Sequence, residues 1–454
     1  MNYSDFVKKE LKRIDDTGVA DFISGLSGSI VLIYSHDDPD GITSALLFTR
    51  LMEKLGVRYT LKLPDTMELE EKRLVKDLEE EEYDAVFVLD KATMGYYDDY
   101  RKLCRKFVVI DHHPLFGEKP QNIMVLNPQL HGGYVGCSGS FLIHMLKEEI
   151  VGTDMYDDFL ALVGLKGDWA IEPATDIVSG YVEEFYTKKT AGELAGFVKK
   201  IHARPTMFEV QQRDVTTLLN MIAELCFALG GGGFQYFYND RHQDLKNTDH
   251  AMFTYEILRE LAGNFSPYTV TQLDDFISNT FDPEKVKLIY GFFLEDWDKA
   301  IGSFSTASDL TVLGNTRLCL FIGDDVPLMP MAGSVYLYGL SSYDKEKVLF
   351  VMINRQRTGG IHFSLRGTGT DVHAGKICSN LAERIIDKYG GKGEVSGGGH
   401  YVAAECRTRM SGVTYEQAFG IFSELVRAME DTDRISDAVK AAELGMEYLV
   451  KERI

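Results

Sequence analysis

The sequence HDDPDG at residues 36–41 has the clearest potential for chemistry, and it completes a short apolar run at residues 29–36. Three carboxylates crowded into one turn repel one another, so they are costly to keep ionised unless a cation lies among them. Asp38 and Asp40 can point in the same direction as His36, which provides oxygen and imidazole donors for a divalent metal ion. Taken alone, the motif also fits a solvated acidic turn, because Asp, Pro and Gly are common turn residues.

Two further apolar runs end in side chains of the same kind. Residues 85–90 end in Asp90, and the run that starts at residue 107 ends in Asp111, His112 and His113. Histidine is a common metal ligand, and neighbouring carboxylates orient it. Each feature has an ordinary alternative: Asp90 as a helix cap or exposed turn residue, and the triplet as one core histidine bonded to Asp111 beside an exposed histidine.

The combination of these side chains is more specific than any of its parts. With Asp168, which follows an apolar helical stretch and could itself be a cap, the chain offers two histidines and four acids at successive element ends. Six such ligands suffice for two divalent ions that share a bridging carboxylate, the usual arrangement for in-line phosphoryl displacement. The set comprises His36, Asp38, Asp40, Asp90, His112 and Asp168. The six cysteines stand singly, so neither a thiolate zinc site nor a disulfide framework is indicated.

The elements that carry these residues predict an α/β fold. Apolar runs at 29–36, 85–90 and 107–113 are typical of buried parallel strands. Amphipathic helices are expected at 42–56, ending at Gly56, and at 69–84. Alternation of strand and helix indicates a doubly wound parallel sheet, in which ligands gather at the carboxyl ends of the strands.

Three domains are predicted along the chain: residues 1–174 with the candidate metal site, a helical insertion or connector at 175–304, and a smaller α/β domain at 305–454. Strands of the last domain are expected at 316–323, 332–340, 347–354 and 361–367. A helix is expected at 374–389, followed by a glycine cluster at 390–400 and a last helical stretch.

Composition limits the kind of partner. The 454 residues carry a formal net charge of −21, which argues against a protein that coats long duplex DNA and favours a narrow channel, a short substrate or a basic protein partner. Bound divalent ions can reverse the local field, so a nuclease is not excluded. No stretch approaches the roughly 20 apolar residues needed to cross a bilayer. The N-terminal residues read as an amphipathic helix rather than a signal peptide, and the cytoplasm is the expected compartment.

These motifs resemble those of the DHH phosphoesterase superfamily, and specifically its archaeal RecJ-like members with a C-terminal DHHA1 domain. The resemblance rests on motifs that occur in family order and span most of the chain outside the helical middle. They are HDDPDG at 36–41, Asp90, DHH at 111–113, Gly167-Asp168, FSLRG at 363–367 and SGGGH at 396–400.

The resemblance implies two Mn²⁺ or Mg²⁺ ions, one held by His36, Asp38 and Asp90 and the other by Asp40, Asp90, His112 and Asp168. A water or hydroxide between the ions would be the nucleophile. His113 would lie beside the scissile phosphate, with Asp111 supporting the site from behind. In the C-terminal domain the resemblance assigns phosphate binding to Arg366, His400 and the backbone amides of Gly397, Gly398 and Gly399.

The sequence departs from the family pattern at two places. Where the family often has D-x-G, this chain has Asp90-Lys91-Ala92, so the ligand is retained but the turn differs. Lys91 would either alter the approach of a phosphate or face solvent. Pro39 stands where small residues are frequent, and neither change removes a proposed ligand.

Three functions are compatible with these observations. The first is a metal-dependent exonuclease that degrades single-stranded DNA or RNA to mononucleotides, with bases stacked on aromatic side chains. The second is a phosphodiesterase for short oligonucleotides or cyclic dinucleotides. The third is a replication scaffold that docks a GINS-like subunit, since relatives in the superfamily serve as partners of the replicative helicase.

Overall fold

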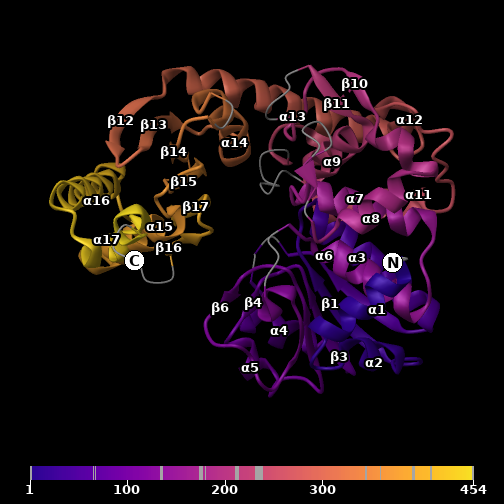
Figure 1. The fold of residues 1–454 in the computed structure, drawn as a ribbon. Helices are drawn as coiled ribbons and strands as arrows, with labels where there is room; N and C mark the ends of the chain where they lie inside the picture. The colour runs from indigo at the N-terminus through magenta and orange to yellow at the C-terminus, as the bar shows by residue number, and fades with distance from the viewer. Residues whose placement is uncertain are drawn as a thin grey trace. The chain divides into compact units, whose positions relative to one another are not determined.

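The computed structural model describes residues 3–64, 66, 68–132, 136–172, 177–178, 180–209, 214–230, 239–342, 345–357, 359–390, 394–409 and 412–451. It forms two compact units, Met1–Phe292 and Phe293–Ile454 (Figure 1), and helix α13 (Pro283–Ser303) passes from one into the other. The division into three domains remains a prediction. Among the described residues, no helix is both long and apolar enough to cross a membrane.

A five-stranded parallel sheet forms the centre of unit 1. Its strand order is β2-β1-β3-β5-β7. The strands are β1 (Ile30–Ser35), β2 (Arg58–Lys62), β3 (Ala85–Leu89), β5 (Phe107–Ile110) and β7 (Met124–Leu126). Ser35 pairs with Leu89, and Leu89 pairs with Ile110, so β1, β3 and β5 end level with one another. The predicted parallel sheet is confirmed, whereas both edge strands, β2 and β7, were absent from the prediction.

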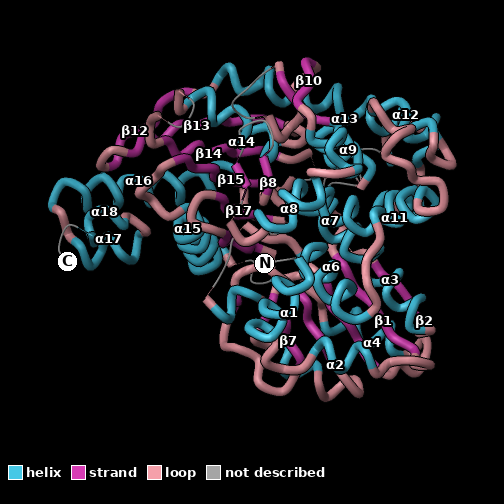
Figure 2. The backbone as a smooth tube through the Cα atoms, turned by 45° about the vertical axis from the view of Figure 1, so that its right-hand side comes forward, coloured by secondary structure: helices cyan, strands magenta, loops and turns pink. Residues whose placement is uncertain are grey.

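Helices cover both faces of this sheet, as a doubly wound fold requires (Figure 2). On one face, Phe48 of α3 (Pro39–Leu55) and Phe22 of α2 (Val19–Ser24) pack against Phe87. On the other, α4 (Glu71–Leu78) and α5 (Tyr97–Tyr100) share a core with the strands, and α4 is shorter than predicted. The helices α1 (Tyr3–Ile14), α6 (Gly139–Ile150) and α7 (Met155–Gly167) complete this part, with short strand pairs β4–β6 (Thr93–Met94, Leu115–Phe116) and β8–β9 (Ile171–Glu172, Ile177–Val178).

The remainder of unit 1 is largely helical, as predicted. It contains α8 (Glu183–Thr190), α9 (Leu218–Leu229), α11 (His250–Leu261) and α12 (Leu273–Ser278). The expected helical connector also contains a short strand pair, in which β10 (Lys200–His202) pairs antiparallel with β11 (Val215–Thr217).

Unit 2 contains a six-stranded mixed sheet of order β12-β13-β14-β15-β17-β16. Its elements are β12 (Ser308–Leu313), β13 (Thr316–Asp324), α14 (Met329–Leu340), β14 (Val348–Arg355), β15 (Ile361–Thr368), α15 (Ala374–Tyr389), β16 (Val395–Gly399), β17 (Ala403–Thr408), α16 (Tyr415–Ile435), α17 (Ala438–Leu444) and α18 (Glu447–Lys451). One face packs against α15 and α16 in a continuous core. The expectation of a separate sheet in the C-terminal part of an α/β fold is thereby confirmed.

One predicted strand of unit 2 is wrong, because residues 332–340 lie within helix α14. The segment AGSVYLYGL is rich in residues that favour strands. However, β13 and β14 pair in parallel, and two consecutive parallel strands need a crossover connection, usually a helix.

Candidate metal centre

The candidate ligands lie at the ends of the strands that finish level in the unit 1 sheet. His36 and Asp38 follow β1, Asp90 follows β3, and His112 follows β5. The strand order changes direction between β1 and β3, and ligands of open α/β sheets bind at such a position. Helix α3 begins at Pro39 because Asp38 caps it, accepting a hydrogen bond of 2.8 Å from the Gly41 backbone N–H.

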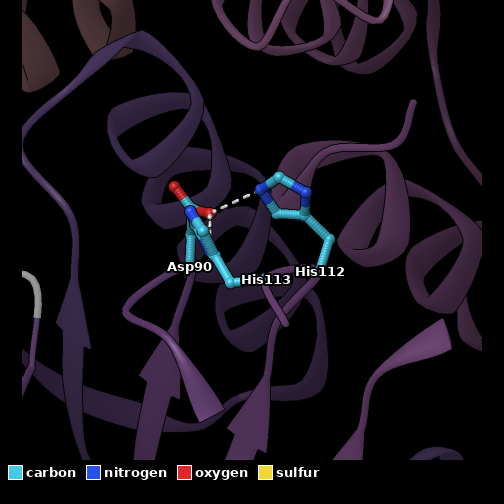
Figure 3. Close-up of side chains that lie close together, drawn as sticks. All are labelled: Asp90, His112 and His113. Atoms are coloured by element: carbon cyan, nitrogen blue, oxygen red, sulfur yellow. Dashed lines mark ion pairs between the residues drawn. The ribbon is translucent and has the colours of Figure 1, made fainter. Parts of the chain in front are cut away.

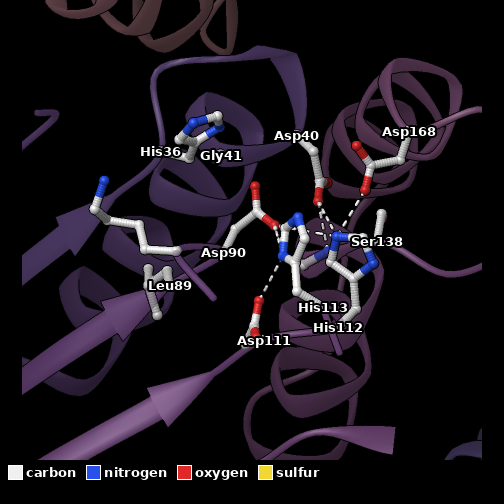
Figure 4. A network of polar contacts seen from close by, with 12 residues as sticks. His36, Asp40, Gly41, Leu89, Asp90, Asp111, His112, His113, Ser138 and Asp168 are labelled. Carbon is white, nitrogen blue, oxygen red and sulfur yellow. Dashed lines mark hydrogen bonds and ion pairs between the residues drawn. The ribbon is translucent and has the colours of Figure 1, made fainter. Parts of the chain in front are cut away.

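The structure brings all six predicted metal ligands together in two groups that share Asp90. One group is His36, Asp38 and Asp90, and the other is Asp40, Asp90, His112 and Asp168. Within each group the candidate donor atoms lie within 4.8 Å of one another. His112 and His113 both turn their rings toward the Asp90 carboxylate (Figure 3), and Asp40 and Asp168 face His112 from the other side (Figure 4).

The side chains of these groups lie close together, yet several of their facing atoms form no hydrogen bond, which suits a divalent cation between them. Four converging atoms are buried without a hydrogen-bond partner: His36 Nδ1, Asp90 Oδ1, His112 Nε2 and Asp168 Oδ2. The His112 Nε2 atom lies 2.7 Å from Asp168 Oδ2 and 3.2 Å from Asp90 Oδ1. Buried polar atoms are normally satisfied, and carboxylate oxygens with imidazole nitrogens are a ligand set for Mn²⁺ or Mg²⁺.

The electrostatics of the cluster also favour a bound cation. Burial, together with the charge of Asp168, raises the pKa of Asp40 to about 7. Burial and the charge of Asp40 likewise raise the pKa of Asp90 well above its ordinary value. Burial alone would lower the pKa of His112, but the adjacent Asp168 carboxylate raises it well above the usual range. Protons are therefore held where cations would otherwise balance the carboxylates.

Asp40 is held by the N-terminus of α6, which sequence analysis did not foresee. Its carboxylate accepts hydrogen bonds from the backbone N–H groups of Gly139, at 2.5 Å, and Ser140, at 3.0 Å. The positive end of the helix suits this anion. A Cβ at Gly164 of α7 would lie 2.5 Å from Asp40 Oδ1, so glycine there makes room for the carboxylate. Ser138, which caps α6 ahead of an apolar run, was the one sequence signal for this arrangement.

Asp111 contacts His113, and the roles that the family resemblance implied for these two residues stay predictions. Asp111 Oδ1 lies 2.8 Å from His113 Nδ1, which leaves Nε2 as the ring nitrogen available to other partners. The second Asp111 oxygen accepts from Thr93 Oγ1 at 2.7 Å, and Asn127 Nδ2 donates to Thr93 and to the His113 carbonyl. Thr93 and Asn127 carried no signal in the sequence, because they are brought to Asp111 only by the fold.

The turn after β3 is strained. Asp90 and Ala92 have positive φ angles of 53° and 58°, a left-handed conformation that is uncommon for residues other than glycine. Lys91 between them is fully buried, and its Nζ donates to the carbonyls of Pro64 and Thr66. Burial lowers the pKa of Lys91 to about 8. The alternative that Lys91 faces solvent is therefore wrong, because its ammonium is used to hold the neighbouring loop.

In unit 2, the predicted phosphate-binding residues lie on β15 and β16. The Arg366 guanidinium is nearly buried, and it donates to the Leu365 carbonyl and to Glu405 Oε1. Glu405 also receives hydrogen bonds from Arg407 and contacts His362 Nε2 at 3.0 Å. Glu405 was not among the predicted site residues, because the strand that carries it, β17, was not predicted.

Two glycines of the SGGGH motif, Gly397 and Gly399, have a packing role. A Cβ at Gly397 would collide with the Cys378 carbonyl of α15. Gly399 has a φ of 137°, a conformation that favours glycine. A Cβ at Gly398 would meet nothing closer than Ser379 Oγ at 3.6 Å, so packing does not require glycine there. His400 is exposed at the end of β16. Phosphate binding by these residues remains a prediction.

A known family model matches the part of the chain that carries all the candidate ligands except Asp168. The family model described as "DHH family, N-terminal domain" matches residues 30–164, which include β1, β3 and β5 and the residues that follow them. No curated protein sequence matches the chain.

Solved structures resemble the fold of the chain at low identity. RecJ from Thermus thermophilus, solved with Mn²⁺, has a TM-score of 0.54 and 14% identity, with 90% of this chain and 54% of that chain covered. The chain thus spans about half the length of that protein. An exonuclease RecJ bound to manganese has a TM-score of 0.48 and 15% identity, with 89% of this chain and 91% of that chain covered. CDC45 from Entamoeba histolytica has a TM-score of 0.48 and 12% identity, with 93% of this chain and 99% of that chain covered. The family model thus matches a DHH N-terminal domain at residues 30–164, and the fold of the chain resembles that of RecJ.

Proposed function

We propose that this chain is a divalent-metal-dependent phosphodiesterase that degrades single-stranded nucleic acid to mononucleotides as an exonuclease. The observation that carries the proposal is the convergence of His36, Asp38, Asp40, Asp90, His112 and Asp168, with four buried donor atoms left without hydrogen bonds. The DHH match supports phosphoester chemistry. The RecJ proteins with this fold were solved with Mn²⁺ or Mg²⁺.

The six side chains would hold two Mn²⁺ or Mg²⁺ ions, with Asp90 common to both. When bound, such ions activate water and neutralise charge on the scissile phosphate. The chain's own contribution is to fix the ligands: α6 holds Asp40, and the cap of α3 fixes Asp38. His113 would present Nε2 to the phosphate, because Asp111 occupies its Nδ1.

Substrate binding in unit 2 belongs to the same proposal. Residues 305–454 would act as a DHHA1 domain, in which Arg366, His400 and the amides of Gly397–Gly399 bind a second phosphate. Glu405 positions the Arg366 guanidinium, and burial of this carboxylate is outweighed by His362, which lowers the pKa of Glu405 well below its ordinary value. A permanently ionised Glu405 would keep Arg366 in one orientation.

The proposal is tested with 5′- and 3′-labelled DNA and RNA oligomers of increasing length, incubated with Mn²⁺ or Mg²⁺. Stepwise loss of mononucleotides from one end is the expected result, and the labelled end that disappears first gives the polarity. Asp38→Asn serves as the matched inactive control, since asparagine also caps helices. Absence of cleavage on every strand, in a folded protein that takes up the metal, would refute the proposal. If the wild-type protein cleaves no strand but binds a GINS-like subunit, that result would favour the scaffold function.

A second candidate function, hydrolysis of short oligonucleotides or cyclic dinucleotides, is favoured by the net charge of −21. Long anionic strands are repelled by such a surface over more of their length than dimers are. The same length series separates the two functions. Turnover that falls steeply beyond pentamers would support the short-substrate enzyme, and equal rates at all lengths would dismiss it.

A further inference from the structure

Trp169 directly follows Asp168 of the metal cluster and has an unusual backbone. Helix α7 ends at Gly167, and the Trp169 backbone N–H donates to the Lys166 carbonyl at 3.1 Å. Its φ of 58° is left-handed, which is uncommon for a bulky residue. Such strain concentrates at functional sites, because the surrounding structure must hold it in place. The indole remains partly exposed.

A rigid support lies behind this indole. The Trp169 and Phe208 rings meet edge to face, with centroids 5.2 Å apart and an interplanar angle of 61°. Phe208 is 1% exposed. The backbone N–H of the preceding residue, Met207, donates at 2.6 Å to the fully buried carboxylate of Glu224, which also accepts the Tyr290 hydroxyl at 2.8 Å. The segment that carries Phe208 is therefore fixed to α9 and α13.

Trp169 contacts Phe208 through one part of its ring system and is only partly buried, so part of its surface is open to a ligand. A nucleobase is joined to its phosphate by the sugar alone. A phosphate bound at the metal cluster therefore brings a base close to the cluster, and Trp169 directly follows one of the proposed ligands. Base stacking on an aromatic side chain is favourable for every base, and tryptophan offers the largest face.

We propose that Trp169, supported by Phe208, is the stacking site for the unpaired nucleobase next to the scissile phosphate. This inference rests on the proposed nuclease function and adds a base-binding site that the metal ligands do not provide. It also gives a reason for single-strand preference, because a base stacked on Trp169 has left its own helix.

The kinetic test compares a single-stranded trinucleotide with the same molecule made abasic at the nucleotide that is released. The measured quantity is kcat/KM for the base-bearing trinucleotide divided by kcat/KM for the abasic one. Trp169→Ala should lower this ratio roughly five- to hundredfold, the range expected for loss of one stacked base. Trp169→Phe should restore most of it, because phenylalanine keeps an aromatic face. An unchanged ratio in Trp169→Ala, with hydrolysis intact, would overturn the inference while the proposed function stands.

A binding test works even if no substrate is hydrolysed. The chain has two tryptophans, and the other one, Trp297, is 6% exposed and stacked on Phe293. Tryptophan fluorescence would be titrated with a thymidine oligonucleotide and with an abasic oligonucleotide of equal length. Both would carry phosphorothioate linkages with Mg²⁺ present, because sulfur is a poor ligand for this hard ion and slows hydrolysis.

Stacking on Trp169 should quench the fluorescence of the wild type and of Trp297→Phe, and only with the base-bearing strand. Trp169→Phe should lose the quenching, and this conservative variant retains an aromatic ring against Phe208. Quenching that persists in Trp169→Phe, or that is equal for the abasic strand, would overturn the inference. Absence of hydrolysis together with base-dependent quenching would reject the nuclease and retain the base-binding site.

Discussion

Substitution of Gly164 by alanine tests whether the position of Asp40 controls metal binding. Gly164 lies in α7, outside the set of proposed ligands, and a Cβ there would come within 2.5 Å of Asp40 Oδ1 and closer still to Ser140 Oγ. A contact of this kind forces the neighbour to move. A displacement of the Asp40 carboxylate would lengthen its hydrogen bonds to the Gly139 and Ser140 N–H groups.

The expected loss of stability is estimated by comparison with a matched control substitution, Gly291→Ala. Gly291 lies within α13, and a Cβ there would meet nothing within 4 Å. Both substitutions gain about 1 kcal/mol from the helix propensity of alanine. The overpacked Gly164→Ala should in addition lose about 1–3 kcal/mol, so its free energy of unfolding should fall below that of Gly291→Ala by this amount. Displacement of the groups that orient a ligand weakens metal affinity about 10- to 100-fold.

The two variants are compared by urea denaturation in EDTA, by calorimetric titration with Mn²⁺ and by oligonucleotide hydrolysis. Gly164→Ala should lose stability, metal affinity and activity together, whereas Gly291→Ala should retain affinity and activity. Loss of stability with full Mn²⁺ affinity would refute the reasoning, because Asp40 would then have moved without consequence for the metal.

Three further predictions concern the strained turn after β3, the protonation of Asp40 and the binding of substrate by Arg366 in unit 2. Ala92→Gly should raise the free energy of unfolding by up to about 1 kcal/mol in urea denaturation, because it relieves the left-handed φ of 58°, whereas Ala92→Val should lower it. Since the pKa of Asp40 is about 7 against an ordinary 3.8, its contribution to the stability of the metal-free protein is complete below about pH 4 and is lost as the pH rises through 7. Mn²⁺ must displace that proton, so calorimetry between pH 5 and 7 should show affinity rising by about tenfold per pH unit for this group. Asp40→Asn should reduce the dependence on pH without removing it, because Asp90 and His112 also hold protons. Arg366→Ala should raise KM more than it lowers kcat in steady-state hydrolysis, while Arg355→Ala, on the exposed end of β14, should change neither.

Much of the fold could be predicted because its signals are local. The central strands β1, β3 and β5 are continuous apolar runs, as strands buried on both faces must be. Helix α3 ends at Gly56, which adopts a φ of 69°. The edge strand β2, by contrast, is short and half exposed, so its sequence lacks the apolar run that revealed the central strands.

Helix α14 shows why local signals fail elsewhere. Its apolar, aromatic sequence suits a strand, and the requirement for a helix comes from the parallel pairing of β13 with β14, a contact between distant segments. The same holds for Lys91, whose burial depends on carbonyls more than twenty residues away.

The sequence by itself determined the identity of the candidate ligands, because metals demand particular donor types and parallel strands present their carboxyl ends at one edge. Tertiary structure decided how those ligands are held. The N–H groups that fix Asp40 lie about a hundred residues from it, and the glycine that makes room for it lies farther along still. Such contacts leave no pattern in a single sequence, since they depend on which helices the folded core brings together.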